Sequence, residues 1–288
     1  MPFFIRISGL LAAGLVLGRL KYSFRKRAVK ILVDFSYYFL VPFLFFLVLV
    51  SQPFHFSRIA KPVFLSWAVI SSGILLAVPF SKLFRMPFRE TVLPLSFMNS
   101  AYLNFPFQSY LLGEGSLFHA LLFNMGVTLF IYSVGVILLE KNKRLNFHRL
   151  PVIHALLLAL VWRSVPLPLY GFMTALGKIL QTYFVPLMLV LVGIQLSALS
   201  LSSLREGLAG SLCRMCGGFI FSFAILYFMP GEPLMKNSLL LSSSMPSAVH
   251  TYILAEKFQA NSPFASSCIL AGTVLSLAVF PLVFPCFS

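Results

Sequence analysis

The hydrophobic positions of this chain run in long stretches and do not alternate with polar ones. Each stretch is close to the roughly 20 residues that a helix needs to cross the hydrocarbon core of a bilayer. The stretches are separated by short polar segments. They predict ten membrane-spanning helices near Pro2–Arg19, Val29–Val50, Pro62–Phe84, Glu90–Gly113, Leu117–Leu139, Leu150–Val165, Phe172–Leu196, Leu208–Met229, Leu234–Lys257 and Pro263–Phe284.

Basic residues gather in alternate connections between these helices. The odd-numbered connections carry most of the 22 lysines and arginines, from the cluster at Arg19–Lys30 to Lys257. Because basic residues near helix ends stay on the cytoplasmic side, both termini are predicted to lie outside, in a bacterial inner (plasma) membrane. The first helix is expected to be retained, because its basic cluster follows the apolar run, whereas in a signal peptide it would precede it.

Composition supports a chain that lies almost wholly in the bilayer. The 288 residues are 59% hydrophobic and 10% charged, with a mean hydropathy of +0.93. Soluble domains have about 25% charged residues, so the fold class is predicted to be an all-α polytopic membrane protein. The net charge of +15 is explained by cytoplasmic basic residues and contact with anionic lipid, so no nucleic-acid partner is expected.

Two of the ten helices contain polar residues and a proline where the apolar run should continue. In the fourth and ninth helices, the residues concerned are Asn99, Ser100, Asn104 and Pro106, and Ser242, Ser243, Ser244 and Pro246. A broken helix exposes backbone groups that need a polar partner or a cavity in the membrane. The second half-helices are predicted to begin at these prolines, and their free N–H groups and positive dipole ends favour an anion.

The chain carries a weak internal repeat. The segment around Pro42 is "YYFLVPFLFFLVL", and the segment around Pro186, 144 residues later, is "QTYFVPLMLVLVG". Two five-helix repeats are therefore predicted, over residues 1–145 and 146–288, and the odd number of helices inverts the second. The broken fourth and ninth helices are expected to cross at a substrate site.

The C-terminal third holds the most specific sequence. Ser242 to Val283 reads "SSSMPSAVHTYILAEKFQANSPFASSCILAGTVLSLAVFPLV". This stretch, with the Tyr38-to-Pro42 segment and an Asn99 that lies seven residues before Pro106, resembles the auxin efflux carrier family. That family is similar in architecture to the bile-acid/sodium symporters. The chain resembles a prokaryotic-type member, because only Lys141–Phe147 joins its halves where plant carriers have a long loop.

The resemblance implies ten helices in a scaffold part and a transport part that cross at the fourth and ninth helices. It also implies export or exchange of organic anions, such as auxin-like or dicarboxylic acids. Asn104 and Phe105 stand where many relatives have a glycine before the crossover proline. This departure leaves the shape of the pocket, and therefore the substrate, open.

The polar residues at the breaks have two readings. The asparagines and serines can cap broken backbone, contact substrate, or do both. His250, four residues after Pro246, is either a packed histidine or a group that exchanges protons.

Three of the charged residues within predicted helices are candidates for a coupling or charge role. Asp34 and Lys178 occupy matching repeat positions, where snorkelling to the interface is the simplest role. Asp34 is the first acidic candidate if protons drive transport. Arg214 can attract anions or bind backbone carbonyls.

Other motifs point to little chemistry. Cys213 and Cys216 form a C-x-x-C without a second ligand pair, so no metal or cofactor is expected. Gly14 and Gly18 form a G-x-x-x-G, which allows close helix packing or a homodimer contact. No phosphate loop or catalytic triad is evident, so an enzyme is not expected.

The leading hypothesis is a secondary transporter of small carboxylates that works by alternating access. A sodium-coupled symporter of the bile-acid type is the alternative within transport, although Glu114 is the only acid near the crossing. A receptor that binds a ligand without moving it is the alternative from another class.

Overall fold

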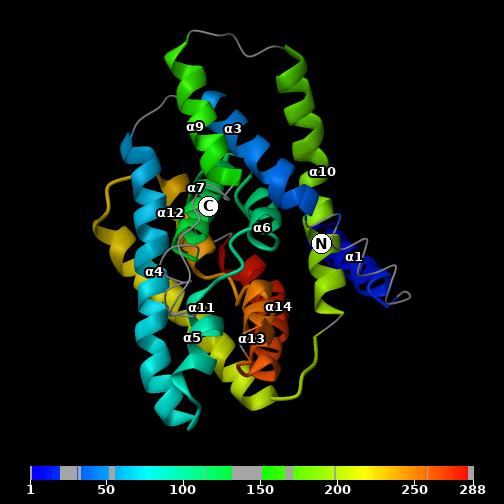
Figure 1. Ribbon diagram of the computed structural model, residues 1–288, viewed down its shortest axis with the longest axis vertical. Helices are drawn as coiled ribbons and strands as arrows, with labels where there is room; N and C mark the ends of the chain where they lie inside the picture. Colours follow the sequence, from blue (N-terminus) through cyan, green and yellow to red (C-terminus); the bar gives the residue numbers. More distant parts are fainter. Residues whose placement is uncertain are drawn as a thin grey trace. The chain divides into compact units, whose positions relative to one another are not determined.

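The computed structural model describes residues 2–19, 31, 34–51, 56–113, 115–131, 151–165, 171–197, 199–257 and 259–284 (Figure 1). Over these residues the predicted all-helical class is confirmed. The elements are α1 (Pro2–Leu17), the π-helical turn η1 (Ser36–Leu40), α3 (Val41–Ser51), α4 (Phe56–Leu83), α5 (Phe88–Ser96), α6 (Asn104–Leu111), α7 (Ser116–Phe130), α9 (Pro151–Ser164), α10 (Gly171–Leu196), α11 (Leu204–Phe228), α12 (Pro233–Ser243), α13 (Val249–Lys257) and α14 (Ser262–Val283).

Four of these helices are long and apolar enough to cross a membrane. They are the Ile59–Leu83 part of α4, together with α10, α11 and α14. Shorter apolar helical stretches cover Ile7–Leu17, Tyr38–Leu47, Ser116–Phe130 and Ile153–Ser164. The chain is therefore a polytopic membrane protein by length and composition, while the count of ten spans stays a prediction. The basic segments at Lys21–Lys30 and Lys141–Arg149, and Glu114, lie outside the described residues.

The helices form two compact units, and each unit draws on both halves of the chain. Unit 1 consists of Met1–Ile5, Lys61–Val127 and Ala198–Ser288, and unit 2 consists of Arg6–Ala60 and Thr128–Ser197. The predicted repeat boundary at residue 145 is a different division, because it follows the chain and not the packing. The packing does not follow this boundary, because most of α4 to α7 lies with α11 to α14 in unit 1.

The helix in unit 2 that contains Pro42 widens just before this proline. The π-helical turn η1 ends at Leu40, two residues before Pro42. Proline lacks the N–H that an α-helix needs and its ring crowds the carbonyl four residues earlier, so a wider turn accommodates it. Pro186, its predicted repeat partner, lies inside α10 without such a change.

The G-x-x-x-G motif of α1 packs inside the chain, against α10 of the same unit. A Cβ on Gly14 would lie 2.3 Å from Val190 O and 2.9 Å from Gly193 Cα. One on Gly193 would lie 2.3 Å from Leu11 O. The two backbones approach this closely only because both positions are glycine. Close packing is therefore the observed role of the motif, and a homodimer stays a prediction.

In unit 1, matching close contacts recur about 145 residues apart. A Cβ on Gly73 of α4 would lie 2.7 Å from Ser96 Cα, at the end of α5. A Cβ on Gly218 of α11 would lie 2.1 Å from Ser243 O, at the end of α12. In both places a long helix meets the end of a short one at a glycine. The two five-helix repeats stay a prediction.

Candidate functional site

Two interrupted helices meet inside unit 1. The segment between α5 and α6 meets the segment between α12 and α13, where Met98 and Ser247 form an antiparallel bridge. Asn99 N donates to Pro246 O at 2.8 Å, and Ala248 N donates to Phe97 O at 2.9 Å. Backbone groups that each break exposes are thus satisfied by the other break, as a low-dielectric surrounding requires.

A buried network of side chains joins α6 to α12 beside this bridge. Asn104 Nδ2 donates to Ser242 Oγ at 2.9 Å and to Ser100 O at 3.1 Å. Gln108 Nε2 lies within hydrogen-bonding distance of Ser238 O (2.9 Å), Ser242 Oγ (3.0 Å) and Asn104 Oδ1 (3.1 Å). These five residues are buried. We call them, with Asn99, the crossing network.

Asn99 and Ser100 hold the first break in shape. Asn99 Oδ1 accepts from Leu103 N at 3.3 Å, and Ser100 Oγ donates to Asn124 Oδ1 at 2.7 Å. Asn99 therefore satisfies one backbone N–H group at the break, which is the first of its two expected roles. Its expected contact with substrate stays a prediction.

The three predicted serines of the ninth helix do not act alike. Ser242 belongs to the crossing network, whereas Ser243 Oγ donates to Leu239 O at 2.8 Å and Ser244 Oγ donates to Leu240 O at 2.7 Å. A hydroxyl that bonds the carbonyl four residues earlier satisfies itself on its own helix. Of these three serines, only Ser242 links the two broken helices through its side chain.

The half-helices do not begin at the prolines, and this part of the prediction was wrong by two to three residues. Helix α6 begins at Asn104, so Pro106 lies in its first turn, and α13 begins at Val249, after Pro246. Asn99 Oδ1 accepts from Leu103 N just before α6, and the carbonyl of Pro246 accepts from Asn99 N. The N–H groups of α6 are partly occupied, since Phe105 N donates to Ala101 O at 3.0 Å.

The ionisable candidates fall in different places. His250 is exposed near the start of α13, and its ring stacks 6.1 Å from that of Tyr102. In unit 2, Asp34 is half-buried and Lys178 is exposed, as snorkelling residues would be. Arg214 is buried in unit 1, where its Nη2 donates to Ser243 O at 3.0 Å. The structure therefore brings only Arg214 and His250 into the unit that holds the crossing.

Sequence reasoning missed Gln108 and Ser238, which complete the crossing network. Gln108 lies four residues after Asn104, and Ser238 lies four residues before Ser242. Residues four apart share a face of a helix, so two polar pairs in apolar segments were the available signal. Ser238 Oγ also donates to Ser116 O at 3.0 Å, which ties α12 to the start of α7.

Comparison with known proteins finds similarity to membrane transporters. Residues 143–284 match the model of a family described as "Membrane transport protein". The similarity to this family covers just under half of the chain. The chain is also 29% identical over 194 residues to an uncharacterized transporter of Methanothermobacter thermautotrophicus, with 64% of this chain and 63% of that relative covered. The chain thus spans less than two thirds of the length of this curated relative.

The matched segment contains one side of the crossing. Ser238, Ser242 and Arg214 lie within the matched residues, whereas Asn104 and Gln108 lie before them. The crossing network therefore joins the matched domain to the first half of the chain. The expected family resemblance is confirmed.

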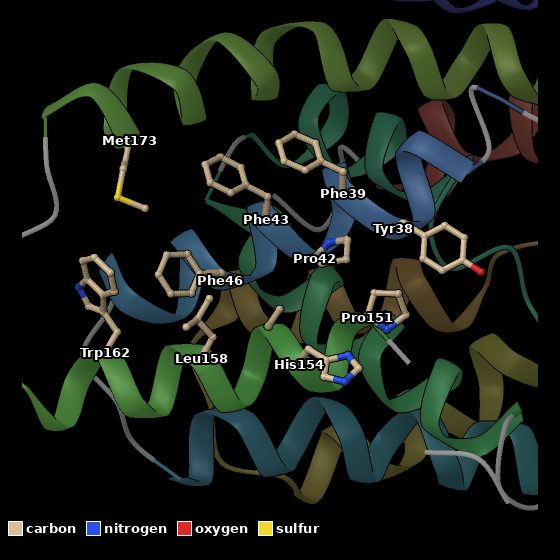
Figure 2. A pocket seen from close by; sticks show the side chains of 11 residues that line it. Tyr38, Phe39, Pro42, Phe43, Phe46, Pro151, His154, Leu158, Trp162 and Met173 are labelled. Carbon is tan, nitrogen blue, oxygen red and sulfur yellow. The ribbon is translucent and has the colours of Figure 1, made fainter. Parts of the chain in front are cut away.

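Unit 2 has a pocket of its own, of about 680 Å³ (Figure 2). Figure 2 shows Tyr38, Pro151 and His154 toward one end and Trp162 and Met173 toward the other. The remaining lining residues are apolar: Phe39, Pro42, Phe43, Phe46, Ala155 and Leu158. His154 is the one basic side chain of the lining, so this pocket offers less to a carboxylate than the polar crossing does.

Metal chemistry has no visible site in the described part of the chain. Within it, no three histidine, cysteine, aspartate or glutamate residues are grouped to hold a metal ion. Cys213 and Cys216 are free thiols on α11, half-buried and exposed respectively.

Replacing Asn99 by alanine tests the capping role. Removal of a capping side chain costs about 0.5–2 kcal/mol, so the unfolding temperature of the purified protein should fall. An unchanged melting curve for Asn99→Ala would contradict the assigned cap.

Proposed function

We propose that the protein is a secondary transporter of small organic anions that carry a carboxylate. The observation that supports this best is the crossing of two broken helices inside unit 1, held by the buried crossing network. Discontinuous helices that cross near the membrane midplane are where transporters of this design bind their substrates. The family match supports the class of activity, and the substrate is our proposal.

Unit 1 is proposed to move against unit 2 during transport. Each unit combines helices from both halves of the chain, so each holds together as a body during such a movement. The bridge between Met98 and Ser247 lies wholly within unit 1, so the crossing would travel as one piece. Alternating access follows if this movement exposes the crossing first to one side of the membrane and then to the other.

Export or uniport needs no coupling ion in this proposal. An interior-negative membrane favours outward movement of an anion by about 2.3 kcal/mol per charge at 100 mV. Asn99, Ser100, Asn104 and Ser242 would supply hydrogen bonds to the bound anion after exchange with their present partners. Localisation in a bacterial plasma membrane, with both termini outside, belongs to the same proposal.

Flux of labelled acids into proteoliposomes tests this function. Benzoate and succinate are offered with the membrane potential, the pH gradient and the sodium gradient imposed one at a time. Flux that follows the potential alone is expected. Binding of an acid without flux would favour a receptor. Empty liposomes serve as the leak control, because flux without an imposed gradient and without binding fits neither a transporter nor a receptor.

Sodium coupling is the second candidate, and one observation favours it. Gln108 Oε1 is a buried oxygen without a hydrogen-bond partner in the structure. Sodium is a hard cation that prefers oxygen ligands, as calcium does. A strict requirement for the sodium gradient in the same liposomes would replace the uniport reading with this one.

A further inference from the structure

Arg214 places a positive charge in the interior of unit 1. It lies on α11, and its side chain is 1% exposed. No other lysine, arginine, aspartate or glutamate is buried among the residues that the structure describes. Because a charge inside a membrane protein is costly, such residues usually mark a substrate or ion pathway.

The protein satisfies little of this guanidinium. Nη2 donates to Ser243 O at 3.0 Å, at the last residue of α12, and the buried Nε has no hydrogen-bond partner. A guanidinium has five N–H donors, so one hydrogen bond leaves most of its capacity for something else. Gly218 keeps the space beside it open, because a Cβ there would lie 2.8 Å from Arg214 Nη1.

The matching place in the first half of the chain shows that packing alone does not require a charge here. Val69 precedes Gly73 by four residues, as Arg214 precedes Gly218. Val69 is fully buried, and α4 still meets the end of α5 at Gly73. A long helix can therefore pack against the end of a half-helix with an apolar residue at this position. The arginine has another reason to be present.

An anion at the crossing needs a positive partner, and the helix ends supply little. Leu103 N and Phe105 N at the start of α6 are occupied by Asn99 Oδ1 and Ala101 O. Arg214 bonds Ser243, the residue next to Ser242 of the crossing network. The guanidinium and the network therefore contact consecutive residues at the end of α12.

We propose that Arg214 binds the carboxylate of the transported anion, an inference that rests on the proposed function. A guanidinium can donate two parallel hydrogen bonds to a carboxylate, here from Nε and a neighbouring Nη. Binding would give the buried Nε its partner and neutralise the charge of both groups. The substrate would then lie between Arg214 and the crossing network, against the end of α12.

Direct binding and flux measurements on variants test this assignment. Wild type, Arg214→Gln and Arg214→Lys are titrated with benzoate and succinate by thermal shift in detergent, with benzamide as the uncharged comparison, and their flux is measured in proteoliposomes. Arg163→Gln is the matched control, because Arg163 Nη1 also donates to a backbone carbonyl, Leu49 O at 2.9 Å, but in unit 2.

The glutamine variant should bind carboxylates about 10- to 100-fold more weakly than wild type, because it loses charged hydrogen bonds. Benzamide should shift the unfolding temperature of neither the wild type nor the variant. The lysine variant should fall between, and Arg163→Gln should bind as wild type does. If Arg214→Gln does not fold, the lysine variant decides, because it keeps the charge without the two-pronged geometry.

The inference is overturned if the folded glutamine variant binds carboxylates as tightly as wild type does. If only the lysine variant folds, the same result for that variant overturns it. Either result leaves the transport proposal standing. Wild-type protein that neither binds nor moves any acid overturns the transport proposal itself. The two failures are therefore distinguishable within one series of measurements.

Discussion

Gln108→Leu is expected to produce less folded protein and to abolish most flux per folded molecule. The amide of Gln108 contacts Ser238 O, Ser242 Oγ and Asn104 Oδ1. Leucine fills a similar space but donates nothing, so Asn104 Oδ1 loses its donor inside the membrane. A buried acceptor without a donor costs about 1–3 kcal/mol, and the link between α6 and α12 weakens further. Fluorescence-detected size exclusion measures the yield, and proteoliposome flux measures the activity.

Gln195→Leu is the matched control for this substitution. Gln195 lies on α10 of unit 2, and its Oε1 has no hydrogen-bond partner in the structure. Its replacement should leave yield and flux close to the wild-type values. Equal effects of the two substitutions would show that loss of any amide in the membrane explains the result, and the crossing network would then have no special role.

Gly218→Ala is expected to reduce folded protein more than any other single methyl addition in α11. The new Cβ would lie 2.1 Å from Ser243 O and 2.8 Å from Arg214 Nη1. The first contact is with backbone, so α11 must move away from the end of α12. Overpacking of this kind typically costs about 1–3 kcal/mol. The unfolding temperature in detergent should fall, and carboxylate affinity should fall with it if Arg214 binds the anion.

The neighbouring glycine supplies the control. A Cβ on Gly217 would lie 2.5 Å from Leu76 Cδ1, the far end of a flexible side chain that can rotate away. Gly217→Ala should therefore keep most of the folded yield. A larger loss for Gly217→Ala than for Gly218→Ala would contradict the close contact between α11 and the end of α12.

The broken helices were predictable from local sequence. Asn99, Asn104 and Pro106 interrupt one apolar run, and Ser242 and Pro246 interrupt another. The structure has the breaks in those two segments. Their limits were less predictable, because the carbonyl of Pro246 accepts from Asn99 N, which belongs to the other broken helix.

The partners of the polar residues were beyond sequence reasoning. Gln108 meets Ser238 and Ser242, which lie 130 and 134 residues away. Arg214 meets Ser243, 29 residues away on the next helix. Hydropathy says that such residues are costly in a membrane, but it does not say which of them offset that cost together.

By itself, the sequence determined that the chain lies in a membrane, that it is helical, and where its helices must break. These features follow from hydropathy and proline chemistry, which act over a few neighbouring residues. Only the tertiary structure decided that both halves contribute to each unit, that Gln108 joins Asn104 and Ser242, and that Arg214 faces the end of α12. These features depend on distances between residues far apart in the chain, which packing sets and local composition does not.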